Sequence, residues 1–566
     1  MKLTNAVLHK DNNGRKIQQK RLGIMNRIWM LLGLAVLLMS ADACTRKSAE
    51  ATGTTTGSSS TQTTQSTQTG SDGNAGAMTS GGQEYGAGDY LALAPLVGAN
   101  VQGAFMRMRE VNSSPFYKNA SKVNELGITL TRGLSGTGAT YSRYGDPKRD
   151  PLYKGMGWGK SAQEYPTHKR AVKIQKRDTK ERNSFYDDWI DFTNATNMKD
   201  MILVANMYMP FSELEAFIEK ARANGVNILW LEADNETNST EHQEGLFELL
   251  KEVDPKATTY NRAMATEKAF GLYWDWVGEL EDFGTEMGIP VSVVGTPSAY
   301  AFPEMLDPKT MGDKANISPN KVKSDRLFNQ IGSDRTKANK LETKAVSRHR
   351  YRQYDLVRGE VNARNDVLRK KLEYPIYRSY YRDLKKTEVD HYRKLYPNSQ
   401  IIFTEWGLRK PEGGAGNSFA VAVDVAKFLV ANCQINVDYG FNVVDAVTFQ
   451  SMYGHKMGGL IYHDNNSAVK IAPEGIAMSM FSQLSGRPIL EIGNGDDSKT
   501  QWIRIACAEG EKIFFYNLGN SDMNISYSGD VEFLQSEDLL SENTTIDRQN
   551  GVSKLPKHSI GVLTIK

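Results

Sequence analysis

The sequence predicts an α/β protein in which a (β/α)8 barrel, the TIM-barrel fold, is followed by a C-terminal antiparallel β-sandwich. Two observations predict this fold class. Between residue 103 and about residue 485, short apolar segments that favour strands alternate with amphipathic segments that favour helices, which is the order of parallel βα units. After Gly486 the helical pattern stops, and only strand-like segments separated by turn residues follow.

Eight strand-like segments occur in the first region, which favours a closed barrel over an open sheet. They cover residues 103–111, 126–134, 201–209, 226–236, 290–299, 344–355, 400–408 and 446–454. Helical periodicity marks residues 185–198, 211–225, 262–287, 420–435 and 473–486, and a polar helical region fills residues 360–395. The barrel is therefore assigned to residues 91–486, with an insertion at residues 305–344.

The β-sandwich is assigned to residues 487–566. Four strand-like segments lie there, with the sequences TQWIRIACAE, EKIFFYNLG, MNISYSG and HSIGVLTIK. Turn residues separate them and no helical pattern interrupts them, as expected for a small all-β domain. The apolar stretch just before residue 103 could add one more strand to this domain.

The first 90 residues have the pattern of a targeting segment. Residues 28–39 are an apolar run of twelve, which is too short to span a bilayer, where about 20 residues are needed, and fits a signal-peptide core. The small residues before Cys44 resemble a bacterial lipobox. Residues 1–44 are therefore predicted to be a signal peptide that starts at Met25 and leads to lipidation of Cys44. Ordinary secretion, with Cys44 as a bystander, is the alternative.

Residues 45–90 are rich in Thr, Ser, Gly and Gln and have little apolar surface to bury, so they are predicted to form a flexible tether. A tether directly after a lipid anchor would hold a folded domain away from a membrane. The sequence thus predicts a lipid-anchored protein of the bacterial cell envelope. The outer membrane is the expected site, with the domain facing the periplasm or the exterior.

Composition excludes several classes of protein. With 40% hydrophobic residues and a net charge of +3, the chain is not intrinsically disordered and has no overall reason to bind nucleic acid. Three cysteines are too few for a disulfide-built module. Cys433 and Cys507 lie in apolar surroundings, so buried free thiols are expected, with a disulfide between them as the alternative. No metal-ligand spacing, phosphate loop or nucleophile elbow occurs, so no metal or cofactor is implied, and a monomer is expected.

Two glutamates end strand-like segments. Glu236 follows Asn235 at the end of the fourth segment, and Glu405 ends the seventh. In a barrel the groups that carry out chemistry lie at the C-terminal ends of the strands, and an apolar strand that ends in a carboxylate is costly unless that carboxylate is solvated or paired. Two carboxyl groups about 5–5.5 Å apart are what a retaining glycosidase requires.

At these positions the sequence resembles the clan A glycoside hydrolases, in which an Asn-Glu pair ends strand four and a Glu ends strand seven. The resemblance spans about residues 100–566 and is carried by motifs at the strand ends. It implies a retaining O-glycoside hydrolase in which Glu236 is the general acid/base and Glu405 the nucleophile. Asn235 would bind the sugar 2-hydroxyl, and Arg132 would lie near the nucleophile and keep it ionised.

Further strand ends fit the same resemblance. His349 and Tyr351 resemble a His-x-Tyr motif that ends strand six in several clan families. The other expected substrate contacts are Asn206, Trp406, Gln450 and Tyr453. The end of the chain resembles the last sandwich strand of clan families that act on arabinosides and xylosides. The expected partner is therefore a polysaccharide or oligosaccharide substrate.

Structural alternatives accompany these assignments. Glu236 could cap the following helix, Glu405 could pair with an arginine for structural reasons, and His349 could be a surface histidine. Glu232 and Asp234 are interpreted as barrel-interior or loop residues. At the level of function, the alternative to a hydrolase is a non-catalytic surface glycan-binding lipoprotein on the same scaffold.

The charge is unevenly distributed. Residues 301–400 contain 23 Lys and Arg against 13 Asp and Glu, so this segment is strongly basic and the remainder of the chain is acidic. Tyrosines are interleaved with these charges. A basic and aromatic wall beside a sugar cleft would suit an anionic glycan, such as a sulfated galactan or a uronate polymer, as in agarase-like and porphyranase-like enzymes. The alternative is a solvated, salt-bridged helical segment.

Overall fold

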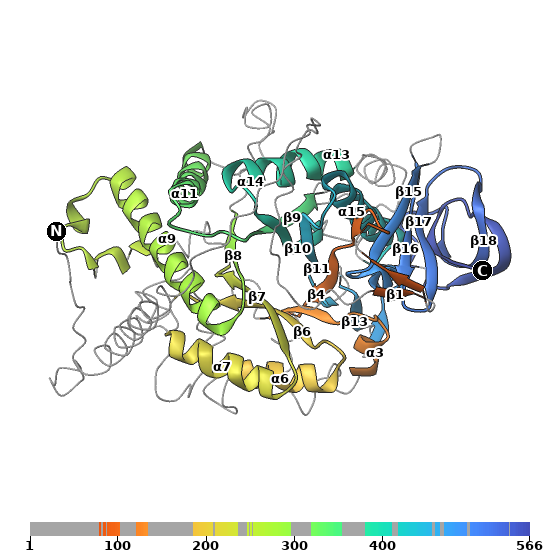
Figure 1. The fold of residues 1–566 in the computed structure, drawn as a ribbon, viewed down its shortest axis with the longest axis horizontal. Coiled ribbons are helices and arrows are strands. Elements are labelled where there is room, and N and C mark those ends of the chain that lie inside the picture. The colour runs from red at the N-terminus through yellow and green to blue at the C-terminus, as the bar shows by residue number, and fades with distance from the viewer. Residues whose placement is uncertain are drawn as a thin grey trace, which may run out of the picture. The chain divides into compact units, whose positions relative to one another are not determined.

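In a computed structural model, the protein contains a closed barrel of eight parallel strands and a C-terminal antiparallel sheet (Figure 1). The structure describes residues 78–101, 120–133, 185–235, 246–295, 319–353, 380–409 and 417–566, apart from short gaps at 81–82, 87, 208–209, 248, 252, 455–458, 464–468, 495–498 and 543. The predicted signal peptide with Cys44, and nearly all of the predicted tether, lie outside the described residues.

The barrel strands follow one another around the ring in chain order. They are β4 (Leu96–Asn100), β5 (Leu130–Gly133), β6 (Asp200–Ala205), β7 (Asn227–Ala233), β8 (Val291–Val294), β9 (Ala345–Gln353), β10 (Gln400–Arg409) and β11 (Val444–Phe449). Pairing of β11 with β4 closes the ring, and every neighbouring pair is parallel. The predicted fold class is therefore confirmed, and the two glutamate-bearing segments are strands four and seven, as predicted.

The first barrel strand differs from the prediction. Strand β4 occupies residues 96–100, whereas the segment predicted as strand one, residues 103–111, lies outside the described part of the chain. The residues just before β4 form β3 (Ala92–Leu93), which pairs with the C-terminal sheet. The stretch before residue 103 thus contributes one strand to each domain, which its single apolar pattern did not distinguish.

Each barrel strand is followed by a described helix. In chain order these are α3 (Ala120–Asn124), α6 (Phe185–Ala195), α7 (Phe211–Ala223), α9 (Arg262–Met287), α11 (Pro319–Lys337), α13 (Tyr380–Leu384) with α14 (Asp390–Leu395), α15 (Phe419–Tyr439) and α16 (Pro473–Phe481). A π-helical turn (Lys385–Val389) joins α13 to α14. The long helix α9 begins where the Asn261 side chain accepts the Met264 N–H at 3.0 Å, and it ends at Gly288 in the left-handed conformation.

Helix α11 corrects part of the predicted insertion at residues 305–344. It lies between β8 and β9 in the chain and packs against α9 and α14, so it is the barrel helix that follows strand five. Its Phe328 is fully buried and contacts the rings of Phe270 and Trp274. The helix is so rich in charged and polar residues that one buried face was not evident from the sequence.

Inside the barrel, an apolar layer lies below a polar one. A separate cluster of inward-facing side chains comprises Leu130, Ile202, Trp230, Ala345, Ile402 and Ala446. Two residues further along their strands, Arg132, Glu232 and Thr404 are also fully buried but polar. Because side chains alternate along a strand, this second layer faces the same interior, nearer the C-terminal ends where barrel sites lie.

Helix α15 lies between the barrel and the C-terminal sheet. In the described part of the chain it alone is long and apolar enough to cross a membrane, and 89% of its most apolar window is buried inside the protein. It packs against β10 and β11 on one side and against strands of the sheet on the other. The N–H groups of Phe419 and Ala420 donate to the carbonyl oxygens of Ser541 and Leu539, both at 2.8 Å. Helix α15 therefore belongs to a hydrophobic core that the barrel and the C-terminal sheet share.

The C-terminal sheet has seven strands in the order β19-β18-β20-β17-β16-β15-β3. Besides β3 these are β15 (Pro488–Asn494), β16 (Thr500–Cys507), β17 (Gly510–Asn517), β18 (Met523–Gln535), β19 (Asp547–Leu555) and β20 (Ser559–Ile565). Residues such as Phe514 join the main core with the barrel, whereas Phe515 and Trp502 belong to a second small core of the sheet itself. Two buried layers on one antiparallel sheet are consistent with the predicted β-sandwich.

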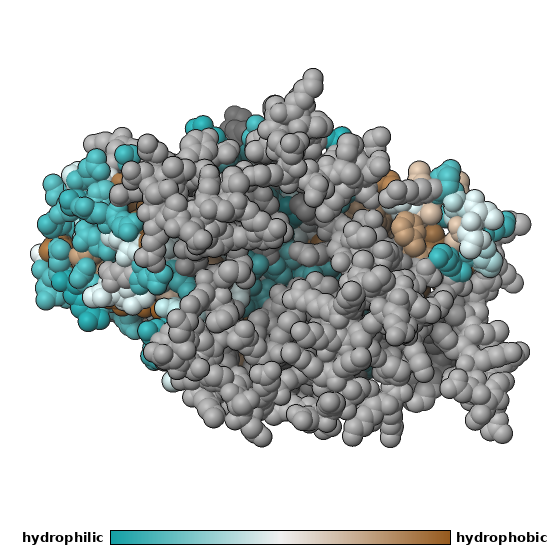
Figure 2. Space-filling model, turned by 180° about the vertical axis from the view of Figure 1, so that it is seen from behind, coloured by the Kyte–Doolittle hydropathy of each residue, from teal (hydrophilic) through white to brown (hydrophobic). Residues whose placement is uncertain are grey.

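The described surface is mainly hydrophilic where Figure 2 shows it. Large hydrophobic side chains are exposed in the described residues only at Leu91, Val253 and Met264. Cys433 and Cys507 are buried free thiols, as expected, and burial raises the pKa of the Cys507 thiol to about 11. These two thiols are therefore protonated near neutral pH and unreactive.

Candidate active site

The end of β7 turns sharply inside the barrel mouth. Asp234 has a left-handed backbone with φ of 66°, which is uncommon for a residue other than glycine. Its carboxylate accepts the N–H of Asn235 at 2.7 Å and that of Met207 at 3.3 Å. The Tyr273 hydroxyl of α9 donates to the Ala233 carbonyl at 2.7 Å. These contacts fix the turn that presents Asn235 and buries both Asp234 and Asn235.

A β-bulge in β10 directs Glu405 into the barrel. The register of β10 against β9 shifts between Phe403 and Glu405, so Thr404 is the extra residue. Phe403 and Trp406 pack outward against Phe428 of α15. Both Thr404 and Glu405 therefore face the interior, although neighbouring residues of a regular strand would face opposite sides.

Arg132 of β5 lies at the centre of the site and is fully buried. Its Nη1 donates to Oε1 of Glu405 at 2.7 Å, and its Nη2 donates to Oδ1 of Asn235 at 2.8 Å. Its Nε donates to Oε2 of Glu232, whose other oxygen accepts the Thr404 hydroxyl at 2.8 Å. The guanidinium thus connects strands two, four and seven at the level where the predicted nucleophile lies.

The electrostatics of the site follow from burying one cation between two anions. Burial acts to lower the pKa of the Arg132 guanidinium, but the adjacent carboxylates of Glu232 and Glu405 outweigh it and raise that pKa above its ordinary value. Arg132 therefore stays charged. A permanent positive charge therefore lies in direct contact with the Glu405 carboxylate.

His349 is the next group around Glu405. It is paired with Glu405 in the β9–β10 register, its Nδ1 lies 3.8 Å from Oε2 of Glu405, and its side chain is 15% exposed. Tyr351, two residues further along β9, is paired with Gly407, but its side chain lies outside the described part. The structure thus brings Arg132, Asn235, His349 and Glu405 together.

Other predicted site residues are placed as follows. Asn206 is buried directly after β6, and Gln450 follows β11, where its N–H donates to the Trp406 carbonyl at 2.8 Å. Tyr453 belongs to β12 (Tyr453–Gly454), with its side chain outside the described residues. Trp406 is fully buried on the outer face of β10 and stacks on Phe428, because the bulge turns it away from Glu405. It is therefore a core residue here rather than a substrate contact.

Glu236, the predicted acid/base, lies outside the described residues. Its predecessor Asn235 is held by Arg132 at the barrel mouth, so the chain leaves the described part at the C-terminal end of strand four. Its role stays a prediction from the sequence.

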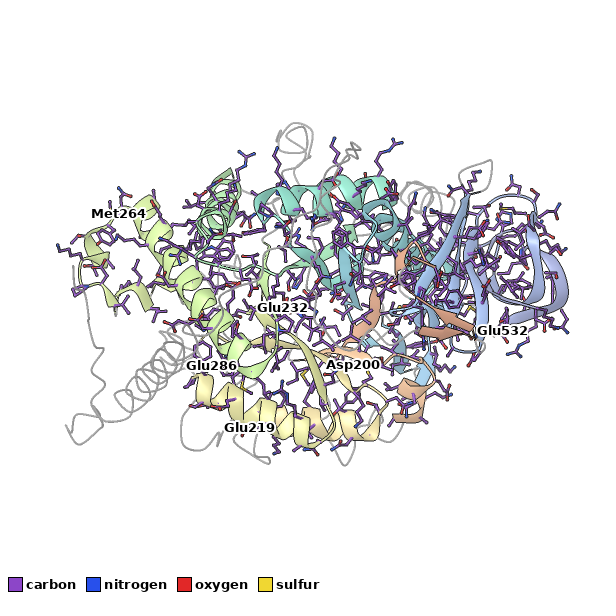
Figure 3. The ribbon with its side chains drawn as sticks, viewed as in Figure 1. Asp200, Glu219, Glu232, Met264, Glu286 and Glu532 are labelled. Carbon is purple, nitrogen blue, oxygen red and sulfur yellow. The ribbon has the colours of Figure 1, made fainter. Side chains whose placement is uncertain are left out.

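Two residues of the site were not predicted as functional. The sequence places Glu232 in the barrel interior or a loop, which fits its position in Figure 3. It does not predict the contact of Glu232 with Arg132. Thr404 was not singled out at all. One feature of the sequence could have indicated Glu232. It is a carboxylate two residues after Trp230 in an apolar strand, and a carboxylate buried there needs a partner.

In the described residues, no group of three or more His, Cys, Asp or Glu could hold a metal ion.

A second buried carboxyl lies where loops of the barrel mouth meet α16. Glu474 is fully buried, its Oε1 accepts the Asn417 N–H at 3.2 Å, and its Oε2 has no hydrogen-bond partner. Desolvation raises the pKa of this carboxyl to about 8, and the nearby charge of Glu542 adds to the increase. Glu474 is therefore neutral at pH 7.

Glu474 should make stability depend on pH. In the unfolded chain it ionises near the ordinary glutamate pKa of 4.5, but in the folded protein it keeps its proton up to about pH 8. Between these values the folded state binds more protons, so the free energy of unfolding should fall as pH rises, by up to about 1.4 kcal/mol per unit from this group. Glu474→Gln should remove this fall in denaturation experiments from pH 5 to 8. The surface variant Glu532→Gln should keep the wild-type dependence of the unfolding free energy on pH. The same dependence in Glu474→Gln would refute the assignment of Glu474 as a neutral buried carboxyl group.

Comparison with known proteins bears on the fold. No family model matches the chain, and no curated protein sequence matches it either. The crystal structure of a GH51 arabinofuranosidase from Xanthomonas axonopodis pv. citri superposes with a TM-score of 0.52 at 11% identity, over 84% of this chain and 97% of that one. AbfB, a family 51 alpha-L-arabinofuranosidase from Bifidobacterium longum, gives 0.50 at 12% identity, over 85% and 98%. The chain therefore shares the barrel-plus-sheet fold of GH51 arabinofuranosidases over most of its length.

Proposed function

We propose that the protein is a retaining O-glycoside hydrolase that acts on a polysaccharide or oligosaccharide. The observation that carries the proposal is the contact between Arg132 and Glu405, because it holds a carboxylate against a fixed cation at the C-terminal end of barrel strand seven. The fold shared with arabinofuranosidases supports the same conclusion.

In the proposed mechanism, an oxygen of Glu405 attacks the anomeric carbon while the bond from that carbon to the leaving oxygen breaks. Glu236 donates its proton to the leaving oxygen. In the second step Glu236 takes a proton from water, the water oxygen attacks the anomeric carbon, and Glu405 leaves with its electron pair. Asn235 and Arg132 bind and orient the reacting groups. The product keeps the anomeric configuration of the substrate.

The role of Glu236 is tested by changing the leaving group. Glu236→Gln should slow cleavage of an unactivated glycan by about 10²–10⁴-fold, which is the usual contribution of general acid catalysis. A nitrophenyl glycoside needs little protonation as it leaves, so formation of the covalent intermediate should be much less affected and a burst of nitrophenol should appear. The control Glu219→Gln changes an exposed carboxylate of α7 and should behave as wild type. Equal losses on both substrates would contradict a role as acid.

The charge of the glycan is part of the proposal. The basic segment at residues 301–400 motivates an anionic substrate, although several of its described cations are already paired, among them Arg335 with Asp275, Arg348 with Glu388 and Lys385 with Asp438. A panel should compare arabinan and xylan with a sulfated galactan and a polyuronate, by release of reducing ends at low and high salt. Preference for an anionic polymer that weakens with salt would support this part.

Two further parts of the proposal concern the rival function and the location. Tight binding to a glycan of the panel without any release of reducing ends would favour the non-catalytic glycan-binding lipoprotein.

We also propose that Cys44 carries a lipid and that residues 45–90 tether the domain to the bacterial envelope. The mass of the mature N-terminal peptide tests this, because an unlipidated N-terminus would indicate ordinary secretion.

A further inference from the structure

Glu232 is a fully buried carboxylate that the mechanism above does not use. It lies on β7 in the middle of the barrel, whereas Glu219 and Glu286 lie on the helices α7 and α9 (Figure 3). Each of its oxygens accepts a different side chain, Oε2 from Nε of Arg132 and Oε1 from the Thr404 hydroxyl at 2.8 Å. A buried charge is costly unless it is paired and hydrogen-bonded, and here both conditions are met.

We propose that Glu232 is a positioning residue that orients Arg132 toward Glu405, an inference that rests on the proposed function. A guanidinium is a rigid planar fork, so fixing its Nε fixes the directions of both Nη groups. With Nε held by Glu232, Nη1 points to Glu405 at 2.7 Å and Nη2 to Asn235 at 2.8 Å. One anchor therefore aligns the nucleophile and the residue that precedes the acid.

Thr404 connects Glu232 to the backbone of the strand that contains the proposed nucleophile. It is the bulged residue immediately before Glu405, and its hydroxyl reaches Glu232. Its carbonyl accepts the Thr448 hydroxyl of β11 at 2.5 Å, so the bulge is held from the neighbouring strand as well. Glu232 thus fixes Glu405 twice, once through Arg132 and once through the bulge.

The alternative is that Glu232 only balances the charge of Arg132 and stabilises the fold. The chain contains a matched pair for comparison. Arg348 and Glu388 are also buried, with Nε to Oε2 at 2.7 Å, but Arg348 lies on the outer side of β9, where it stacks on Tyr392. A carboxylate that only stabilises should behave like Glu388, whereas a positioning residue should change turnover.

Glu232→Gln and Thr404→Val test the proposal. Glu232→Gln should lower kcat by about 10²-fold, the scale expected when reacting groups are misplaced by about 1 Å, with KM changed less than about threefold. Thr404→Val should lower kcat by about tenfold, and Thr404→Ser, which keeps the hydroxyl, should restore it. The control Glu388→Gln should lower the melting temperature but leave kcat of the folded enzyme unchanged.

A crystal structure of Glu232→Gln gives a readout that does not depend on activity. The proposal predicts that Nη1 of Arg132 moves out of hydrogen-bond distance from Glu405. If wild type hydrolyses no glycan but Arg132 moves as predicted, the proposed function fails and the positioning contact stands. If wild type is active and both Glu232→Gln and Thr404→Val keep wild-type kcat, or Arg132 does not move, the positioning role is overturned. The Thr404 variants keep the test decisive if Glu232→Gln does not fold.

Discussion

Replacing Glu405 by alanine should reduce turnover by at least about 10⁴-fold, which corresponds to about 5 kcal/mol of activation free energy. The cause is the loss of the group that forms the covalent bond, since Arg132 cannot take its place. The fold should survive, because Arg132 keeps the Glu232 carboxylate as a buried partner when that of Glu405 is removed. Release of reducing ends and circular dichroism together measure both effects.

Azide distinguishes the two carboxylates. In Glu405→Ala, azide can enter the space left by the carboxylate and displace an activated leaving group once, so the glycosyl azide should have inverted configuration. In Glu236→Ala, azide should instead attack the intermediate on Glu405, and the product should keep the configuration of the substrate. Turnover of Glu405→Ala within about threefold of wild type would refute the nucleophile assignment.

Arg132→Met should be among the most destabilising single changes in the barrel. It leaves Glu232 and Glu405 as two buried carboxylates without their common cation. Removing one partner of a buried ion pair typically costs about 3–5 kcal/mol of unfolding free energy, because the remaining charge is left uncompensated. Denaturant titration measures the loss, and the folded fraction of the variant should also be inactive.

Arg548→Met is the matched control for this prediction. In the wild-type protein, Nε of Arg548 lies 2.7 Å from Oε1 of Glu532. This pair is as close as that of Arg132 with Glu405, but its two side chains are 68% and 50% exposed. Exposed ion pairs contribute about 0–1 kcal/mol. Similar losses of stability in the two variants would contradict the view that Arg132 is held as a buried charge.

The strand ends were predictable from sequence because apolar runs that stop at a carboxylate have few structural explanations. Asn235 and Glu405 were found in this way, and both lie against Arg132. The bulge at Thr404 was not predictable, since alternation along β10 would have placed Trp406 inside and Glu405 outside. One extra residue in the strand reverses the orientations of both side chains, and no local pattern in the sequence indicates that residue.

Contacts between side chains of different barrel strands were also not predictable from the sequence. Glu232 and Arg132 belong to different strands, and each was understood separately, one as an interior residue and the other as a neighbour of Glu405. The first strand shows a different limit. Residues 96–100 and 103–111 are both apolar and strand-like, and only the pairing of β4 with β11 and β5 identifies the segment that closes the barrel.

Trapping the covalent intermediate shows whether Glu405 is the nucleophile of a retaining hydrolase. The enzyme would be incubated with a 2-deoxy-2-fluoro glycoside that has an activated leaving group and the sugar identified from the panel, then digested and analysed by mass spectrometry. We expect a mass increase of one fluorosugar residue on Glu405. A label on another residue, or hydrolysis with inverted configuration and no labelled peptide, would contradict it.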